Sequence, residues 1–381
     1  MASSIETTST TTTLKNNGNT YLSVDTNDDV AITNTLTATS PTFVTPNIGA
    51  ATVTSLNGGQ LAGNRNKIIN GDMKIDQRNA GAAVTPTDGL FSADRWRCGL
   101  NQASKFSIQQ QSEAPAGFSS SLKITSLSAY SLAVGDLFLF EQRIEGFNFS
   151  DLAWGTASAK AVTLSFYVRS SLTGTFGGSV RNAANARSYP FNYTISSADT
   201  WEQKTVTIAG DTSGTWVTTN AHSATVGFGL GVGANFTASA GSWVGSAELS
   251  ADSSVSVVGT NAATFYITGV QLEEGSVATP FERRPYGTEL ALCQRYYEKF
   301  DVGTIVTTTS GANYGAVGFY KVQKRAIPTV TLILSVSTYG FDGTIGTQYT
   351  NTVSSTNYYK AATATQHGSA FTHTLAATAE L

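Results

Sequence analysis

The feature that most constrains the fold of this chain is a strict alternation of apolar and polar residues. The same segments show no helical periodicity. In the segment AVTLSFYVRS, Val162, Leu164, Phe166 and Val168 fall on one side of an extended backbone, and the residues between them fall on the other. This period of two is typical of an antiparallel strand with one face in the core. Similar segments recur from about residue 67, separated by turns such as SLTGTFGG and GDTSGTW. The pattern predicts a two-sheet sandwich of jelly-roll type.

The composition is that of a strand-and-turn protein without a charged partner. Charged residues make up 13% of the chain, about half the usual share, while 36 glycines and many Thr, Ser and Asn residues replace them. A formal net charge of −3 does not indicate the positively charged surface that binds nucleic acid or an anionic membrane. No run approaches the roughly 18 apolar residues of a membrane span, and no signal peptide is visible at the N-terminus. We therefore expect no nucleic-acid partner and no membrane insertion. Cys98 and Cys293 form no C-x-x-C, which favours folding in a reducing cell.

Residues 1–63 hold too few apolar residues for a core of their own. Short alternating pieces such as YLSVD and DVAIT predict brief strands joined by polar turns. Either the segment is disordered, or identical copies wind together into a shared core, and its regular apolar spacing favours the second. We expect a virion-docking tail and an intertwined trimeric shaft here. The spaced apolar positions are Leu22, Val24, Val30, Ile32, Leu36, Phe43, Val44, Ile48, Val53 and Leu56.

The remaining chain divides into three parts. We expect a jelly-roll sandwich over residues 64–283, a linking helix over 284–300 and a small C-terminal β domain over 301–381. In the last part, Val330, Leu332, Leu334 and Val336 alternate strictly, and Pro328 precedes them. The fold class is therefore all-β with one short helix.

The predicted helix is expected to act as a joint. Thr288 is a suitable cap, and an apolar stripe follows at i, i+3, i+7 and i+10. So short a helix must bury its stripe against a sheet or against copies of itself. A buried, inert thiol is favoured over a nucleophile within that stripe, because no His lies near it in sequence. The stripe consists of Leu290, Cys293, Tyr297 and Phe300.

The paired Glu273 and Glu274 invite an acid/base interpretation, which needs two carboxyl groups facing one another across a sugar. Neighbours on a strand point to opposite faces, so these two cannot make that pair by themselves. The alternative is a structural ion pair between one of them and Arg283 or Arg284, and we expect this.

No other motif predicts catalysis, a cofactor or a metal. His222, His367 and His373 lack metal-ligand spacing. GFGLGVG at residues 227–233 has a glycine pattern like a dinucleotide loop but stands among strands without a following helix. DTNDD at residues 25–29 has calcium-type ligands, although a plain turn is favoured.

Several motifs in order carry a resemblance to a known family. ATFYITGVQLEEG resembles the closing strands of carbohydrate-binding-module-like jelly rolls. NKIINGDMKIDQRNAG, SADRWRC, GVQLEEGSVATPFERRPYGTELALCQRYYEKF and the terminal LAATAEL together resemble bacteriophage tail-fibre or virion-fibre proteins over residues 66–381. The resemblance implies a homotrimeric virion appendage, assembled in the host cytoplasm, which docks on another virion protein through its N-terminal segment and meets host-surface glycan. It implies no chemical step.

Three alternatives to a tail fibre stay open at this point. A fibre on the capsid head would have the same sequence features. A polysaccharide depolymerase would need a long β-helix or convergent carboxylates, and neither is evident. A free carbohydrate-binding protein would leave the shaft unexplained.

Sugars are held by aromatic faces and planar polar groups, which directs attention to aromatic residues in loops. Trp96 and Trp201 are expected to be framework. Packing is about as probable as glycan contact for the five candidates, which are Trp216, Trp243, Arg187, Tyr189 and Tyr193.

Overall fold

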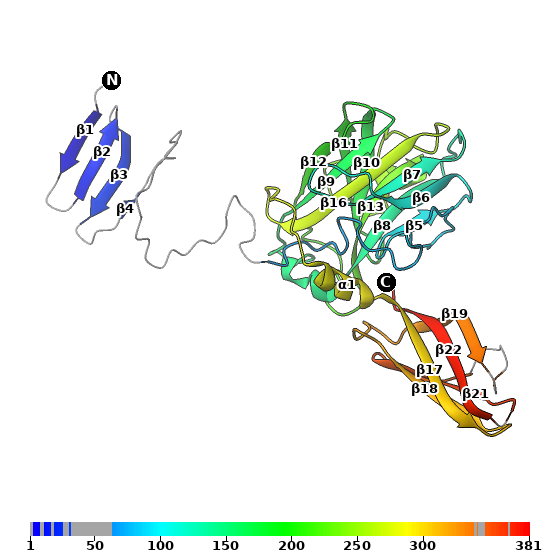
Figure 1. Cartoon of the computed structure of the whole chain (residues 1–381). Coiled ribbons are helices and arrows are strands. Elements are labelled where there is room, and N and C mark those ends of the chain that lie inside the picture. The colour runs from blue at the N-terminus through cyan, green and yellow to red at the C-terminus, as the bar shows by residue number, and fades with distance from the viewer. Residues whose placement is uncertain are drawn as a thin grey trace. The chain divides into compact units, whose positions relative to one another are not determined.

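A computed structural model of the chain describes two units, Met1–Val53 and Thr54–Leu381 (Figure 1). The backbone is described for residues 3–7, 11–16, 19–25, 30–31, 63–338, 341, 347–364 and 366–381. Side chains are described for residues 63–303, 308–334, 341, 351–358, 360, 362–364 and 370–381.

The first unit contains a four-stranded antiparallel sheet in which each strand pairs with the next. YLSVD lies within the strand Asn19–Asp25, and of DVAIT the structure describes Val30–Ala31, which is a short strand. Residues 32–62, on which most of the expected shaft falls, lie outside the described residues, as does most of the DTNDD segment. The strands are β1 (Ser3–Thr7), β2 (Thr11–Asn16), β3 (Asn19–Asp25) and β4 (Val30–Ala31).

The second unit begins with the predicted jelly-roll sandwich, whose two five-stranded antiparallel sheets we call sheet I and sheet II (Figure 1). Sheet I has the order β11-β10-β13-β8-β5, and consists of β5 (Arg97–Leu100), β8 (Leu137–Glu145), β10 (Gly174–Asn182), β11 (Ser188–Ile195) and β13 (His222–Val232). Sheet II has the order β12-β9-β16-β7-β6, and consists of β6 (Phe106–Gln111), β7 (Ser121–Ser126), β9 (Val162–Ser170), β12 (Glu202–Ile208) and β16 (Thr264–Glu274).

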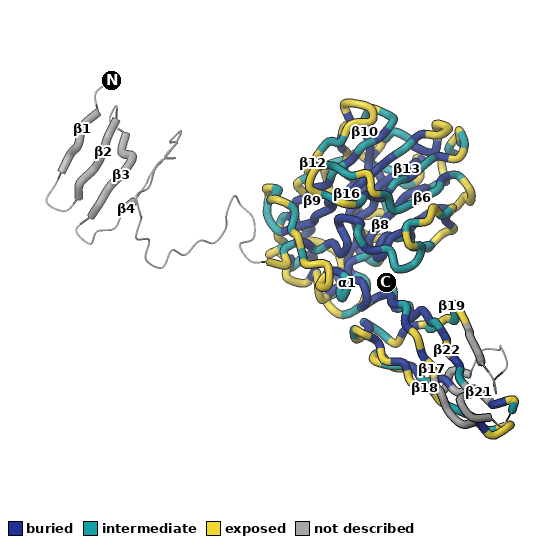
Figure 2. The backbone as a smooth tube through the Cα atoms, viewed as in Figure 1, coloured by how far each residue is buried: buried dark blue, intermediate teal, exposed yellow. Residues whose placement is uncertain are grey.

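Aromatic rings from both sheets fill the core of the sandwich, which Figure 2 shows as buried strands. The Phe228 ring of sheet I stacks on Phe140 at 5.2 Å and meets the edge of Phe166 from sheet II at 5.0 Å. The alternation predicted for β9 is confirmed, since Val162, Leu164, Phe166 and Val168 are all fully buried. This row holds sheet II against sheet I through the hydrophobic effect.

Short elements connect the strands of the sandwich. Two 3-10 turns follow β8, and a third precedes a two-stranded parallel pair that lies beside β10 and β11. They are η1 (Gly146–Asn148), η2 (Ser150–Leu152), η3 (Ala234–Phe236), β14 (Thr237–Ala238) and β15 (Ser250–Ala251).

The linking helix is shorter than predicted. Helix α1 (Tyr286–Gln294) already contains Thr288, and no side chain caps its start at Pro285. The prediction of a helix to residue 300 is wrong, because β17 begins at Tyr297 and pairs with β22 (Gln366–Thr378). Long-range pairing thus overrides the helical spacing. No helix within the described part of the chain has the length and apolar character needed to cross a membrane.

Two three-stranded antiparallel sheets form the C-terminal β domain, in the orders β17-β22-β19 and β18-β21-β20. The prediction that four apolar residues of β19 share one face is wrong at Leu334, because a bulge shifts the register before this residue, which is 54% exposed, and the Val336 side chain lies outside the described residues. The strands are β17 (Tyr297–Thr308), β18 (Asn313–Phe319), β19 (Thr329–Thr338), β20 (Thr347–Asn351), β21 (Ser355–Ala361) and β22.

The start of this domain is tied to the sandwich by buried contacts. Arg295 forms a bidentate ion pair with buried Glu145 at 2.6 and 3.0 Å, and the Tyr296 hydroxyl donates to the same carboxylate at 2.6 Å. Cys293 and Tyr296 also pack with Ile69 and Ile75 in one apolar cluster. The segment therefore joins two packed bodies.

Candidate functional site

Four of the five residues predicted to contact glycan lie close together, but they pack against one another in a corner of the structure. Trp216 is 7% exposed and lies 5.7 Å from the half-buried Trp243, which contacts Tyr189 at 5.3 Å. The Arg187 guanidinium bonds both oxygens of buried Asp211 at 2.7 and 2.9 Å, and that bond raises the pKa of Arg187. These groups already satisfy one another, so the structure gives them a packing role.

Tyr193 lies elsewhere, in the centre of the sandwich. It shares a face of β11 with Tyr189, as expected, but that face is the inner one. Its ring packs against Phe166 at 4.9 Å and Phe176 at 5.9 Å. Burial raises the pKa of the Tyr193 hydroxyl well above its ordinary value. The side chain offers no surface to a ligand.

The four residues of the predicted apolar stripe also lie on two different elements. Leu290 and Cys293 lie on α1, where Cys293 is fully buried and burial raises the pKa of its thiol. Tyr297 and Phe300 lie on β17, and Phe300 belongs to the core of the C-terminal domain. Trp96 is buried as expected, whereas Trp201 is half-buried and packs edge-on against Tyr266 at 6.1 Å.

The paired carboxylates take different partners from those predicted. Glu273 is buried and lies 3.3 Å from Arg65 Nε, and Glu274 lies 3.0 Å from Lys160 Nζ. Arg284 pairs with Glu282 and Glu289 instead. Glu273 and Glu274 therefore lie in separate ion pairs. Among the described residues, no group of three or more His, Cys, Asp or Glu side chains is placed to hold a metal ion.

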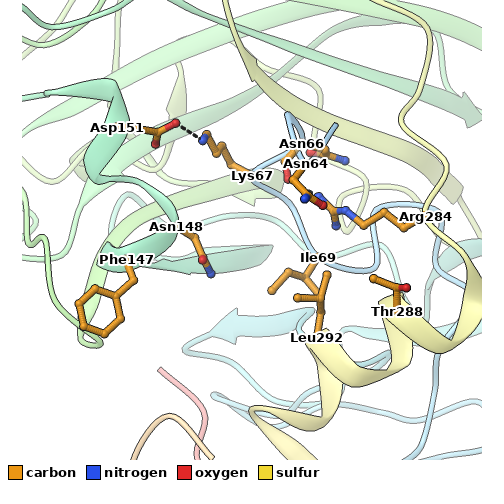
Figure 3. Close-up of a pocket in the computed structure, with 10 residues that line it drawn as sticks. All are labelled: Asn64, Asn66, Lys67, Ile69, Phe147, Asn148, Asp151, Arg284, Thr288 and Leu292. Atoms are coloured by element: carbon orange, nitrogen blue, oxygen red, sulfur yellow. Dashed lines mark hydrogen bonds and ion pairs between the residues drawn. The ribbon is translucent and has the colours of Figure 1, made fainter. Parts of the chain in front are cut away.

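A polar hollow of about 520 Å³ opens where α1, η1, η2 and the segment before β5 meet (Figure 3). Its ionic groups are engaged, since Lys67 Nζ lies 2.5 Å from Asp151 Oδ2 and Arg284 holds two carboxylates. In Figure 3 the Phe147 ring extends away from the other lining side chains. The hollow therefore lacks an aromatic floor.

A second hollow, of about 450 Å³, lies on the outer face of sheet II and has such a floor. We call it the aromatic groove. The Phe118 ring lies 5.3 Å from Tyr167 and 5.2 Å from Phe281, and all three rings are half-buried. The lining residues are Ala116, Phe118, Tyr167, Gln203, Ala278, Thr279, Pro280, Phe281 and Arg283.

A backbone bulge positions these rings. The pairing of β16 with β9 shifts register between Thr268 and Gln271, on either side of Gly269. Gly269 has φ of +62°, and a Cβ there would lie 2.7 Å from Phe118 Cζ and 3.1 Å from Tyr167 Cδ2. Because glycine adopts positive φ without penalty and leaves this space open, Phe118 can lie on the sheet.

Polar groups border the aromatic groove. The Arg283 guanidinium lies 4.7 Å from the Phe118 ring and 5.8 Å from the Phe281 ring. Within the described side chains no carboxylate lies within ion-pair distance of Arg283, which is exposed. Gln203 Oε1 accepts a hydrogen bond from the Tyr167 hydroxyl at 3.2 Å, so the amide NH₂ of Gln203 can donate to another acceptor. Flat rings beside planar donors are the elements of a sugar site.

The comparisons with known proteins give weak structural likenesses. No protein-family model matches the sequence, and no curated protein matches it. The enzymatically active domain of tailspike protein 4 from bacteriophage CBA120 is 14% identical over 55% of this chain, with a TM-score of 0.30, and this chain covers 21% of that domain. A putative sugar-binding protein from Bacteroides thetaiotaomicron is 14% identical over 55% of this chain and 99% of its own, with a TM-score of 0.33.

A family 11 carbohydrate-binding module from Clostridium thermocellum, in complex with a β-1,3-1,4-mixed-linked tetrasaccharide, is 9% identical over 51% of this chain and 97% of its own, with a TM-score of 0.29. Likenesses this low in identity and TM-score establish no shared function.

Proposed function

We propose that this chain is a virion fibre protein of a bacteriophage tail, and that the aromatic groove binds glycan on the host surface. The observation that carries the binding proposal is the set of three half-buried rings with an exposed guanidinium that has no carboxylate partner among the described residues. Rings of this kind stack on the C–H faces of sugars, and Arg283 and Gln203 supply donors for hydroxyl groups.

Exposed apolar side chains support the homotrimer in this proposal. Half of the ten large apolar residues most exposed in the described chain lie in the C-terminal domain. Contiguous exposed apolar surface marks contact with other chains, and two of the five residues lie together on the exposed face of β18. The five residues are Val317, Phe319, Ile327, Ile333 and Leu334. We expect a mass of three chains in solution that a reducing agent does not change, and a monomer at micromolar concentration would contradict the fibre.

The groove is tested by a matched pair of substitutions on a glycan array. Phe118→Leu removes a ring from the groove and should weaken glycan retention about tenfold, the equivalent of about 1.4 kcal/mol. Phe147→Leu removes a ring that is 62% exposed outside the groove and should leave retention unchanged. Equal retention by both variants and the parent chain would refute glycan binding at this site.

The proposal includes no catalytic step. Glu273 and Glu274 lie in separate ion pairs on opposite faces of β16, which is not the facing geometry that glycoside hydrolysis requires. Incubation with host polysaccharide should release no new reducing ends, and their release would favour a depolymerase. Electron microscopy of particles carrying a labelled chain tests whether the fibre stands on the tail or on the capsid.

A further inference from the structure

A third hollow lies on the outer face of sheet I and gathers three arginines around one carboxylate. We call it the arginine pocket; its volume is about 250 Å³. The register of the sheet places Arg97, Glu141, Gly227 and Ser179 in one row across four strands. Arg143, Thr225 and Arg181 form the next row. The lining residues are Asp88, Arg97, Gly99, Leu137, Leu139, Glu141, Arg143, Arg181, Asn185, Phe236, Ala247 and Leu249.

The charges of the pocket do not balance. Glu141 is 3% exposed and forms ion pairs with three arginines. It lies 2.9 Å from Arg97 and 3.4 Å from Arg143, and Arg181 is closer than either. Burial alone would raise the pKa of Glu141, but the three guanidinium charges together hold it below its ordinary value. Asp88, the second carboxylate, lies 3.2 Å from Arg97. Among the side chains that line the pocket, three cations face two anions, and Arg143 Nη1 also donates to the main-chain oxygen of Leu381 at 2.9 Å.

A glycine lies next to Glu141 beneath the pocket. Gly227 stands in the row between Glu141 and Ser179, where any other residue would project a side chain. A Cβ at Gly227 would meet Glu141 Cβ and Leu139 Cδ1 at 3.7 Å and Arg181 Nη2 at 3.8 Å, which are ordinary contact distances, so glycine leaves a small gap among these side chains. Phe228, the next residue, is buried in the core, so Gly227 lies on the outer face of the strand.

Two donors on this face of sheet I have no hydrogen-bond partner among the described residues, and of the two residues Arg181 lines the pocket while Ser179 does not. Arg181 Nε and Ser179 Oγ are both buried and both lie on the face of sheet I that carries Gly227. Arg181 is 6% exposed and Ser179 is fully buried. A buried donor without an acceptor is costly, so an acceptor brought by a ligand would relieve it.

We infer that the arginine pocket binds the carboxylate of an acidic sugar such as a hexuronate or a sialate. Planar guanidinium groups match a carboxylate in two parallel hydrogen bonds, and the ligand charge cancels the excess positive charge. Leu137, Leu139, Phe236 and Leu249 provide an apolar wall for the ring. The volume lies below the range of about 300–1,000 Å³ that is usual for drug-sized ligands, which suits one sugar unit. This inference rests on the proposed glycan-binding function and adds a second, charge-selective contact.

The test is calorimetric titration of the full chain with methyl glucuronide, with methyl sialoside and with the uncharged methyl glucoside. The acidic sugars should bind at least tenfold more tightly than the glucoside, and Arg143→Gln should abolish that preference. Gly227→Ala places a methyl group on the floor at ordinary contact distances and should weaken acidic binding severalfold. Gly245→Ala, where an added Cβ meets no atom within 4 Å, is the matched control and should bind as the parent does.

Equal affinity for charged and uncharged sugars would overturn the inference, as would displacement of the acidic sugars by an equal concentration of inorganic sulfate, which would indicate a general anion site. If acidic preference is lost while Phe118→Leu still weakens glycan retention, the arginine pocket is refuted and the groove stands. If neither site binds, the proposed function itself fails.

Discussion

The two sheets of the sandwich use arginine in opposite ways on their outer faces. On sheet II, Arg283 is exposed and lies against the Phe118 and Phe281 rings, so its charge contributes little to folding. On sheet I, Arg97 and Arg181 surround a carboxylate that is 3% exposed. A guanidinium over aromatic rings can be removed without leaving a buried charge, whereas one beside Glu141 cannot. The arginine of the aromatic groove can therefore be changed with little loss of stability, whereas the arginines of the arginine pocket contribute to stability.

The largest effect should come from Glu141→Gln. The substitution leaves three guanidinium groups without their shared charge, and breaking a buried ion pair costs about 3–5 kcal/mol. Urea unfolding, followed by tryptophan fluorescence, measures this free energy. A loss below about 1 kcal/mol would show that the arginines of sheet I are as dispensable as Arg283.

Acid should weaken the sandwich through His222, which lies at the start of β13 in sheet I. Burial, followed by the charges of Arg143 and Arg181, lowers its pKa from 6.5 to about 4, although Glu141 opposes this. The folded chain therefore holds His222 neutral while the unfolded chain protonates it. Its contribution is complete above pH 6.5 and is lost as the pH falls towards 4, by up to about 3 kcal/mol.

The corresponding measurement is the free energy of unfolding from pH 7 to pH 4 for the parent chain and for His222→Gln. The difference between the two should change across this range and stay constant above pH 7. Parallel curves would rule out His222 as the titrating group.

A smaller effect is expected on sheet II from Gly269→Ala. An alanine at positive φ costs about 1–2 kcal/mol, and its Cβ would displace the Phe118 ring. Glycan retention should therefore fall together with stability. Gly245→Ala is again the control, and unchanged retention in Gly269→Ala would show that the bulge does not position the groove.

The smallest effect on stability is expected from Arg283→Ala. Loss of an exposed side chain should change the free energy of unfolding by no more than about 0.5 kcal/mol. Glycan affinity should still fall about fivefold to tenfold if the guanidinium donates to the sugar. A stability loss as large as that of Glu141→Gln would remove the contrast between the two faces.

The sequence predicts features of the fold that depend on local pattern. The apolar face predicted for β9 appears in the structure, because strand period is a local property. The end of α1 is not local, since Tyr297 leaves the helical pattern to pair with Thr378, more than eighty residues later. Strand pairing at that distance leaves no signal in helical spacing.

None of the five glycan candidates from the sequence lines the aromatic groove. Trp216 and Trp243 lie in loops, as expected, but Trp154 and Asp211 enclose them. The aromatic groove draws Phe118, Tyr167 and Phe281 from three distant segments, so no motif marks it. Gly269 gave the available signal, because a glycine at a strand bulge indicates close approach by another group.

A crystal structure of the chain with an oligosaccharide from its host surface tests the central claim most directly. We predict a sugar ring stacked on Phe118 or Tyr167, with a hydroxyl group within hydrogen-bond distance of the Arg283 guanidinium. Sugar bound at the Trp216 and Trp243 corner, with the aromatic groove empty, would contradict the account.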